Sequence, residues 1–224
     1  MSLLMSEINI VVHPFYNLRN VVSVIRLAER MKKGKNSFLS LEDIRNSQHP
    51  KAGAYASYLE ELSTFLSGRE RVVLLEGHTF PFFHLFNLPW CSPDPEKGLE
   101  ALLHESPPKE APEGVILTQE GCATPRDDRE VEKLKRAIQG RERIVLHGEY
   151  LLLFIFTNPP SFSEKFYGGC VLSTAAYLGK LVPEAELVIG VTYPSRVNRK
   201  EKLSIERYLG RKILTLEEYI KAQE

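Results

Sequence analysis

The stretch RERIVLHGEY, residues 141–150, contains a short apolar run that stops abruptly at His147, Gly148 and Glu149. Two earlier stretches have the same form: VVLLEGH (72–78) ends in a glutamate, a glycine and a histidine, and VILTQEG (115–121) ends in a glutamate and a glycine. Short apolar runs without polar alternation are typical of strands that are buried on both faces of a parallel sheet. The three stretches therefore predict three such strands, each followed by polar residues beside a glycine.

The rest of the chain alternates strands with helices. Further strands are expected at INIVV (8–12), ELVIGVTYPS (186–195) and the short KILTL (212–216). Apolar residues at helical spacing, bounded by capping residues and glycines, predict helices at 18–31, 55–66, 125–139, 170–181, 199–209 and 215–224. This alternation predicts a single α/β domain over residues 1–224, a three-layer sandwich in which a mostly parallel sheet of five or six strands has helices on both faces.

Three helix starts carry capping signals. Ser40 with Asp43 predicts a short helix that opens with a capping box. Thr215 with Glu218 has the same spacing and predicts a capping box at the start of the last helix. Thr124 is expected to cap the helix before residue 140, with Pro125 at its first position.

The segment at about 79–113 is crowded with prolines and aromatic residues, as in FPFFHLFNLPWCSPDPEKG (80–98). We interpret it as an irregular insertion in the domain, with one short helix near 99–104. Long structured loops often serve as lids or partner surfaces, but so many aromatic residues are more often packed into the core, and packing is the favoured alternative. The run YLLLFIF (150–156) fits either a hairpin strand or a buried helical turn.

The composition limits the classes of function. Hydrophobic residues make up 43% of the 224, enough for a sizeable core. The 29 basic residues balance 29 acidic ones, which argues against a whole-molecule nucleic-acid binder, so any such role needs a local patch. The three cysteines are scattered, which argues against structural zinc or a disulfide framework.

The N-terminal stretch MSLLMSEINIVVHPF lacks the basic region and cleavage site of a signal peptide, and no apolar run is long enough to span a bilayer. We therefore expect a cytoplasmic protein without a membrane partner. A parallel sheet of this size often forms a homodimer, and the sequence leaves that alternative open.

Polar residues gather at the predicted strand ends. Because ligands of open parallel sheets bind beyond the carboxyl ends of the strands, these residues should line one shared site. Those with acid–base character are His13, Glu76, His78, Glu120, His147 and Glu149, and those expected to bind a ligand after the fifth strand are Tyr193, Ser195, Arg196 and Arg199. The adjacent glycines, Gly77, Gly121 and Gly148, allow tight turns and close approach of the backbone to a ligand.

Carboxylates beside imidazoles suit two kinds of chemistry. A buried carboxylate, or a histidine that titrates near neutrality, can transfer protons at physiological pH. The same side chains ligate divalent zinc, manganese or iron; no HExxH motif is present, and a divalent metal is left open. The standard nucleotide-binding motifs, a Walker loop and GxGxxG, are absent. The structural alternative is that each polar residue is an ordinary loop or capping residue.

Part of the C-terminal half resembles a known family. The stretches TPRDDREVEKLKRAIQGRERIVLHG (124–148), GGCVLSTAAYL (168–178) and ELVIGVTYPS (186–195) are similar to isochorismatase-like cysteine hydrolases. The resemblance implies a parallel sheet between helical layers. It makes Cys170 the nucleophile, at a helix N-terminus whose dipole would lower the pKa of the thiol.

The chain departs from the family pattern at three places. Where the family has an aspartate after the first strand, this chain has His13 and Pro14, and where it has a lysine after the third strand, this chain has TQEGC (118–122). About twenty residues separate Gly148 from Cys170, which the family keeps close. The alternative for Cys170 is a small buried helix residue.

Two classes of function fit these features of the sequence. The favoured one is a small-molecule enzyme, a hydrolase, with the His and Glu residues as acid–base groups or ligands. The alternative is a non-catalytic protein that binds a phosphorylated ligand, a nucleic acid or a protein partner through the insertion and a basic segment. The basic residues of that segment are Arg196, Arg199, Lys200, Lys202, Arg207, Arg211 and Lys212. If the strand-end residues serve function, His147→Ala and Glu76→Ala should leave thermal stability nearly unchanged.

Overall fold

The computed structural model describes residues 6–18, 38–104, 110–119, 123–149, 152–153, 167–194 and 196–224. The helix predicted at 18–31 lies almost entirely outside the described residues, as does most of the run 150–156.

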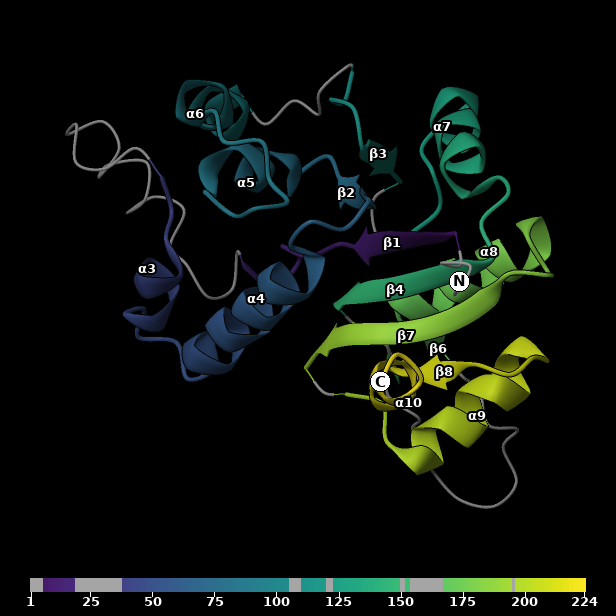
Figure 1. The fold of residues 1–224 in the computed structure, drawn as a ribbon. Helices are drawn as coiled ribbons and strands as arrows, with labels where there is room; N and C mark the ends of the chain where they lie inside the picture. The colour runs from purple at the N-terminus through teal and green to yellow at the C-terminus, as the bar shows by residue number, and fades with distance from the viewer. Residues whose placement is uncertain are drawn as a thin grey trace, which may run out of the picture.

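Six strands form one parallel sheet (Figure 1). In spatial order they are β3 (Val115–Thr118), β2 (Arg71–Glu76), β1 (Glu7–Val12), β4 (Arg143–Glu149), β7 (Glu186–Tyr193) and β8 (Leu214–Thr215). Every pair of neighbours in this order is parallel. A separate antiparallel pair is formed by β5 (Leu152–Leu153) and β6 (Tyr167–Gly168). The parallel sheet predicted from the non-alternating apolar runs is confirmed.

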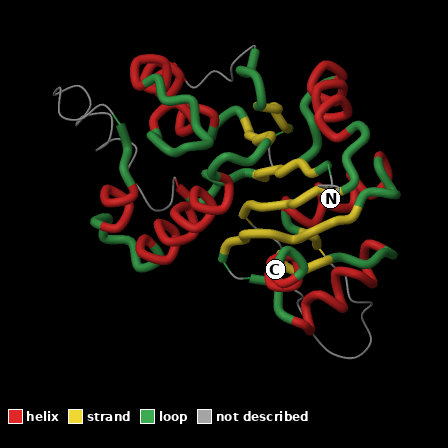
Figure 2. Tube along the Cα trace, viewed as in Figure 1, coloured by secondary structure: helices red, strands yellow, loops and turns green. Residues whose placement is uncertain are grey.

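Helices cover both faces of the sheet, so the molecule has the three layers that were predicted (Figures 1 and 2). One face packs against α4 (Ala52–Leu66) and α10 (Leu216–Lys221), and the other against α7 (Asp128–Ile138), α8 (Cys170–Leu181) and α9 (Arg199–Leu209). Alternate residues of each strand point into the two cores, as Val11 and Ile10 of β1 do.

The Pro-rich segment contains two helices: the later one includes the short helix predicted near 99–104, and the earlier one was not predicted. In α5 (Phe80–Leu85), Pro81 lies in the first turn, and α6 (Pro95–His104) begins with a proline. Proline is tolerated there because the first N–H groups of a helix have no intrahelical acceptor. The two helices pack closely, since a Cβ on Gly98 would lie 2.8 Å from the side chain of Leu85.

The aromatic residues of this segment fill the core. Phe86 and Trp90 are buried and stack on Phe15, with ring centroids 5.3 and 5.2 Å from that of Phe15. The indole Nε1–H of Trp90 donates to Ser63 Oγ at 2.9 Å. The alternative that these aromatics are packed is confirmed.

Two of the predicted capping signals are confirmed. The short helix α3 (Leu41–Arg45) opens with a capping box between Ser40 and Asp43. The last helix, α10, opens with the box between Thr215 and Glu218. In both boxes the side chains satisfy N–H groups that the helix itself leaves without acceptors.

Helix α7 begins later than predicted. Its cap is Asp127, whose side chain accepts the backbone N–H of Glu130, so the assignment of Thr124 as the cap was wrong. Residues 124–126 instead run beside β3, where the N–H of Arg126 donates to Leu117 O at 2.8 Å. A backbone bonded to the sheet in this way cannot also start a helix.

Candidate active site

The strand order reverses between β1 and β4. Going outward from β1 the sheet continues with β2 and β3, whereas outward from β4 it continues with β7 and β8. The loops that leave β1 and β4 diverge at this point, which is the usual place for a ligand in an open parallel sheet. Gly148 brings the two strands close: its φ is +137°, and a Cβ there would lie 2.0 Å from Val12 O.

Glu76 lies at the centre of a cluster at this edge of the sheet. It ends β2, and its side chain is fully buried. Its Oε1 lies 3.5 Å from His13 Nδ1, and its Oε2 lies 3.1 Å from His78 Nδ1. His13 follows β1, and its Nε2 lies 2.8 Å from Thr118 Oγ1 at the end of β3. The structure thus brings together three of the sequence-predicted residues, His13, Glu76 and His78.

The two imidazoles of this cluster differ in their surroundings. The side chain of His13 is 0% exposed and that of His78 is 24% exposed. Burial, with a smaller contribution from the charge of His78, lowers the pKa of His13 to about 4, so His13 is neutral at pH 7. The direction of the bond between its Nε2 and Thr118 depends on the tautomer: the tautomer with the proton on Nδ1 accepts the hydroxyl hydrogen of Thr118 at Nε2. His13 has a φ of +48°, in the left-handed region that residues other than glycine adopt uncommonly.

Tyr16 belongs to the candidate site but was not predicted from the sequence. It lies in the turn after β1, and its ring centroid lies 6.1 Å from that of His78. Partial burial and then the charges of Glu76, Cys170 and Glu149 raise the pKa of its hydroxyl. The hydroxyl therefore lies within electrostatic reach of groups from β2, α8 and β4. A tyrosine four residues beyond a strand end was the only signal in the sequence.

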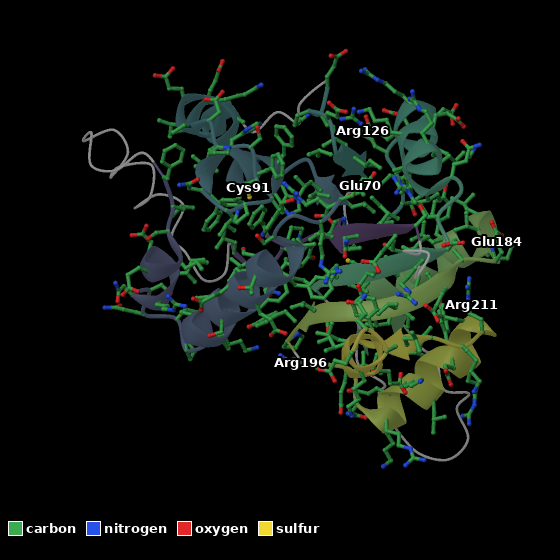
Figure 3. The ribbon with its side chains drawn as sticks, viewed as in Figure 1. Glu70, Cys91, Arg126, Glu184, Arg196 and Arg211 are labelled. Atoms are coloured by element: carbon green, nitrogen blue, oxygen red, sulfur yellow. The ribbon has the colours of Figure 1, made fainter. Side chains whose placement is uncertain are left out.

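Cys170 is the first residue of α8 and follows Gly169, the N-cap. Its side chain is half-buried and packs partly against the core beneath α8. Cys91 is different: it lies beside α5 (Figure 3), and burial raises the pKa of its thiol well above the ordinary value. Cys122 lies outside the described residues.

Glu149 ends β4 and is fully buried beneath the loop that carries Tyr16. Its carboxyl contacts Asn17 of that loop and Tyr55 of α4. Burial raises the pKa of Glu149 to about 8, although the hydrogen bonds that Tyr55, Asn17 and Tyr16 donate to its ionised form act to lower it. Glu149 thus lies next to the cluster around Glu76 but does not face solvent.

His147 lies within the sheet, because β4 continues beyond it to Glu149. Its Nε2–H donates to Asn9 Oδ1 at 3.1 Å, and its Nδ1 accepts the backbone N–H of Val191 at 3.0 Å, where the register between β4 and β7 shifts. Gly190 leaves room for the ring, since a Cβ there would lie 2.5 Å from it. Burial lowers the pKa of His147 to about 3. The structure does not bring His147 to the cluster and gives it a structural role.

The predicted ligand-binding residues have separate surroundings. Tyr193 is buried against Tyr55 and Tyr58 of α4, with ring centroids 5.2 and 5.5 Å apart. The exposed Arg196, at the end of β7 in Figure 3, forms an ion pair with Glu61 at 2.6 Å. Two further predicted residues, Glu120 and Ser195, lie outside the described residues.

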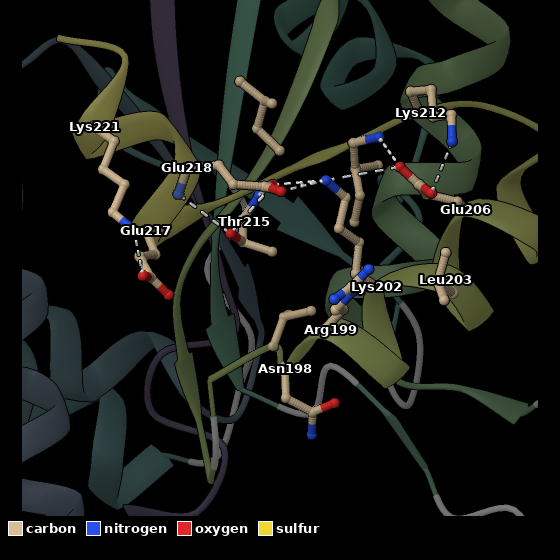
Figure 4. A pocket seen from close by; sticks show the side chains of 13 residues that line it. Asn198, Arg199, Lys202, Leu203, Glu206, Lys212, Thr215, Glu217, Glu218 and Lys221 are labelled. Atoms are coloured by element: carbon tan, nitrogen blue, oxygen red, sulfur yellow. Dashed lines mark hydrogen bonds and ion pairs between the residues drawn. The ribbon is translucent and has the colours of Figure 1, made fainter.

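Arg199 lines an open hollow of about 780 Å³ between α9, β8 and α10 (Figure 4). The lysines that line this hollow are paired with carboxylates: Lys202 with Glu218 at 2.7 Å, Lys212 with Glu206 at 3.4 Å, and Lys221 with Glu217 at 2.7 Å. Lysines that are already neutralised attract a phosphate less strongly. The hollow therefore gives no support to the phosphate-binding or nucleic-acid-binding alternative.

Two general features concern the described part of the chain. Within it, no group of three or more His, Cys, Asp or Glu side chains is arranged to hold a metal ion. None of the helices described here combines the length and the apolar composition needed to cross a bilayer.

Comparison with known proteins gives little further information. No family model and no curated protein sequence matches the chain. Among solved structures, the chain is similar to the crystal structure of an isochorismatase-like hydrolase from Alkaliphilus metalliredigens, with 15% sequence identity and a TM-score of 0.39 over 98% of this chain and 99% of that one. A similarity of this strength does not transfer a residue role or an activity.

Proposed function

We propose that the protein is a small-molecule hydrolase in which Cys170 is the nucleophile and His78, oriented by Glu76, is the acid–base group. The observation that carries this proposal is the position of Tyr16: its ring centroid lies 6.1 Å from that of His78, and its hydroxyl pKa is raised first by burial and then by the charges of Glu76, Cys170 and Glu149. This supports a site in which a cysteine at a helix N-terminus acts with a carboxylate–imidazole pair, at the edge of the sheet where ligands of parallel sheets bind.

The ion pair between Glu76 and His78 places a buried carboxylate beside the proposed base. Glu76 Oε2 and His78 Nδ1 form an ion pair at 3.1 Å, so that Nε2 is the nitrogen left to exchange protons with a substrate. The other carboxylate oxygen lies beside the neutral His13, which Thr118 holds in turn. A base that is held by a carboxylate, which is itself held by further groups, is the arrangement that nucleophilic catalysis requires.

In the proposed reaction, the thiolate of Cys170 adds to the carbonyl carbon of a small ester, thioester or amide. The positive end of the α8 dipole favours the charge on sulfur before attack. His78 then donates a proton to the leaving group and takes one from the water that hydrolyses the acyl-cysteine. Tyr16 supplies a hydroxyl that can donate to the oxyanion of the tetrahedral intermediate.

The test is turnover of a panel of p-nitrophenyl esters, thioesters and anilides by the wild type, Cys170→Ala and Cys91→Ala, with intact mass measured to detect an acyl adduct. We expect turnover and the adduct to be lost in Cys170→Ala and retained in Cys91→Ala, because Cys91 packs against the other core of the molecule and the pKa of its thiol is raised well above the ordinary value. Equal turnover in the wild type and Cys170→Ala would rule out the cysteine as nucleophile.

A further inference from the structure

Glu149 connects three elements beneath the loop that carries Tyr16. Its Oε2 accepts from the backbone N–H of Asn17 at 2.8 Å and from Asn17 Nδ2 at 2.5 Å. Its Oε1 lies 2.6 Å from the hydroxyl oxygen of Tyr55 in α4. The carboxyl therefore ties the end of β4 to the 14–17 turn and to α4, and the mechanism proposed above does not use it.

A count of hydrogens identifies the charge state of this carboxyl. The Tyr55 hydroxyl has one hydrogen but lies close to two oxygens, Glu149 Oε1 at 2.6 Å and Pro14 O at 2.7 Å. A backbone carbonyl oxygen can only accept, so the Tyr55 hydrogen is needed for Pro14. The remaining short contact, between Tyr55 and Glu149, then requires a hydrogen from Glu149.

We infer that Glu149 is a neutral carboxylic acid that donates to Tyr55, and that this proton positions the 14–17 turn, and with it Tyr16, over the site. The effect of this proton on the site rests on the proposed function, whereas the charge state of Glu149 does not. In this chain of bonds, Glu149 donates to Tyr55 and Tyr55 donates to Pro14 O. Without the proton, Tyr55 must donate to the carboxylate, and Pro14 O loses its donor.

The surroundings of the carboxyl agree with this charge state. Facing it are Tyr55 and Tyr58 of α4 and Tyr16 and Asn17 of the turn, and Tyr193 of β7 packs on Tyr55. No lysine or arginine among the described residues forms an ion pair with Glu149. Burial therefore outweighs the hydrogen bonds and raises the pKa of Glu149 to about 8.

Glu149→Gln tests the inference because its amide NH₂ can donate to Tyr55 as the acid does, while its carbonyl accepts from Asn17. The free-energy linkage has a definite sign: a carboxyl whose pKa rises from 4.5 to about 8 on folding stabilises the fold below pH 4.5, and that contribution is lost as the pH rises through 8. We expect the Tm of the wild type to fall by about 3 °C or more between pH 6 and pH 9, and that of Glu149→Gln to fall by less than half as much.

Infrared difference spectra at pH 7, wild type minus Glu149→Gln, should contain the carbonyl stretch of a protonated acid. Glu206→Gln, at another buried carboxylate, controls for the loss of any glutamate. An ionised carboxylate band for Glu149 at pH 7, or parallel Tm profiles in the wild type and Glu149→Gln, would overturn the inference.

A third readout concerns the site itself. We compare kcat/KM at pH 9 with kcat/KM at pH 7, on an ester that the wild type hydrolyses. This ratio should be about threefold higher or more in Glu149→Gln than in the wild type, because the amide beneath the turn does not lose a proton at pH 9. If no ester is hydrolysed but the infrared and Tm results hold, the proposed function fails and the protonated Glu149 stands. Equal ratios in both proteins would show that the proton does not position the site.

Discussion

Glu76 Oε2 lies 3.1 Å from His78 Nδ1, and of the two side chains only the imidazole is exposed, at 24%. A buried carboxylate that holds one nitrogen of a partly exposed imidazole leaves the other nitrogen for proton exchange. The pair lies just past β2, next to the place where the strand order of the sheet reverses.

His78→Asn should lower kcat on a hydrolysed ester by about 10²-fold or more, since general acid–base catalysis contributes about that much. Because the side chain is partly exposed, the Tm should change by less than about 2 °C. Steady-state kinetics and thermal melts of the same preparations give both values. Full kcat in His78→Asn would remove His78 from the reaction.

His147→Ala should destabilise the protein by about 2–4 kcal/mol, because it leaves the Val191 N–H and Asn9 Oδ1 without their partner inside the sheet. This expectation replaces the one drawn from sequence, in which the variant would keep its stability. His49→Ala is the matched control: that ring contacts an exposed backbone N–H, and its loss should cost less than about 0.5 kcal/mol. Urea unfolding of the two variants measures the difference, and similar losses would contradict the role given to His147.

Acid should destabilise the fold through its buried imidazoles. The pKa values of His13 and His147 fall from 6.5 to about 4 and about 3 on folding, so the unfolded chain binds more protons below pH 6.5. The contribution of these two imidazoles to stability is therefore full above pH 6.5 and is lost as the pH falls toward 4. Glu149 has the opposite effect: its contribution to stability grows as the pH falls from 8 to 4.5. The contribution of this one carboxyl does not offset the loss from the two imidazoles.

Urea unfolding at pH 7, 6 and 5 measures this loss. His147→Gln should show a shallower decline than the wild type, because one of the two imidazoles is gone. A wild-type stability that is constant or that rises from pH 7 to pH 5 would contradict the neutral state of both rings.

Most of the sheet could be predicted from sequence because each strand is a short apolar run with polar residues past its end. His13, Glu76 and His78 were predicted for the same reason: the carboxyl ends of adjacent parallel strands share one edge. Proline composition was misleading in the insertion, where Pro81 and Pro95 occupy the first turns of helices.

The rest of the site depends on geometry that the sequence pattern does not contain. Tyr16 and Thr118 are neither acidic nor basic, and they belong to the site only because the turn after β1 and the end of β3 meet beside Glu76. His147 was misplaced because the register shift in β4 turns its ring into the ladder with β7. A shift of that kind changes the direction of a side chain without changing the hydrophobic pattern.

The central claim is that Glu76 and Cys170 occupy one site, so the charge of one must be felt at the other. The most direct measurement is the rate of alkylation of Cys170 by iodoacetamide at pH 7, located by peptide mass, in the wild type, Glu76→Gln and Glu206→Gln. Removing the charge of Glu76 favours the thiolate, so Glu76→Gln should react about three- to tenfold faster, with Glu206→Gln unchanged. Equal rates in the wild type and a folded Glu76→Gln would show that the two residues do not share a site.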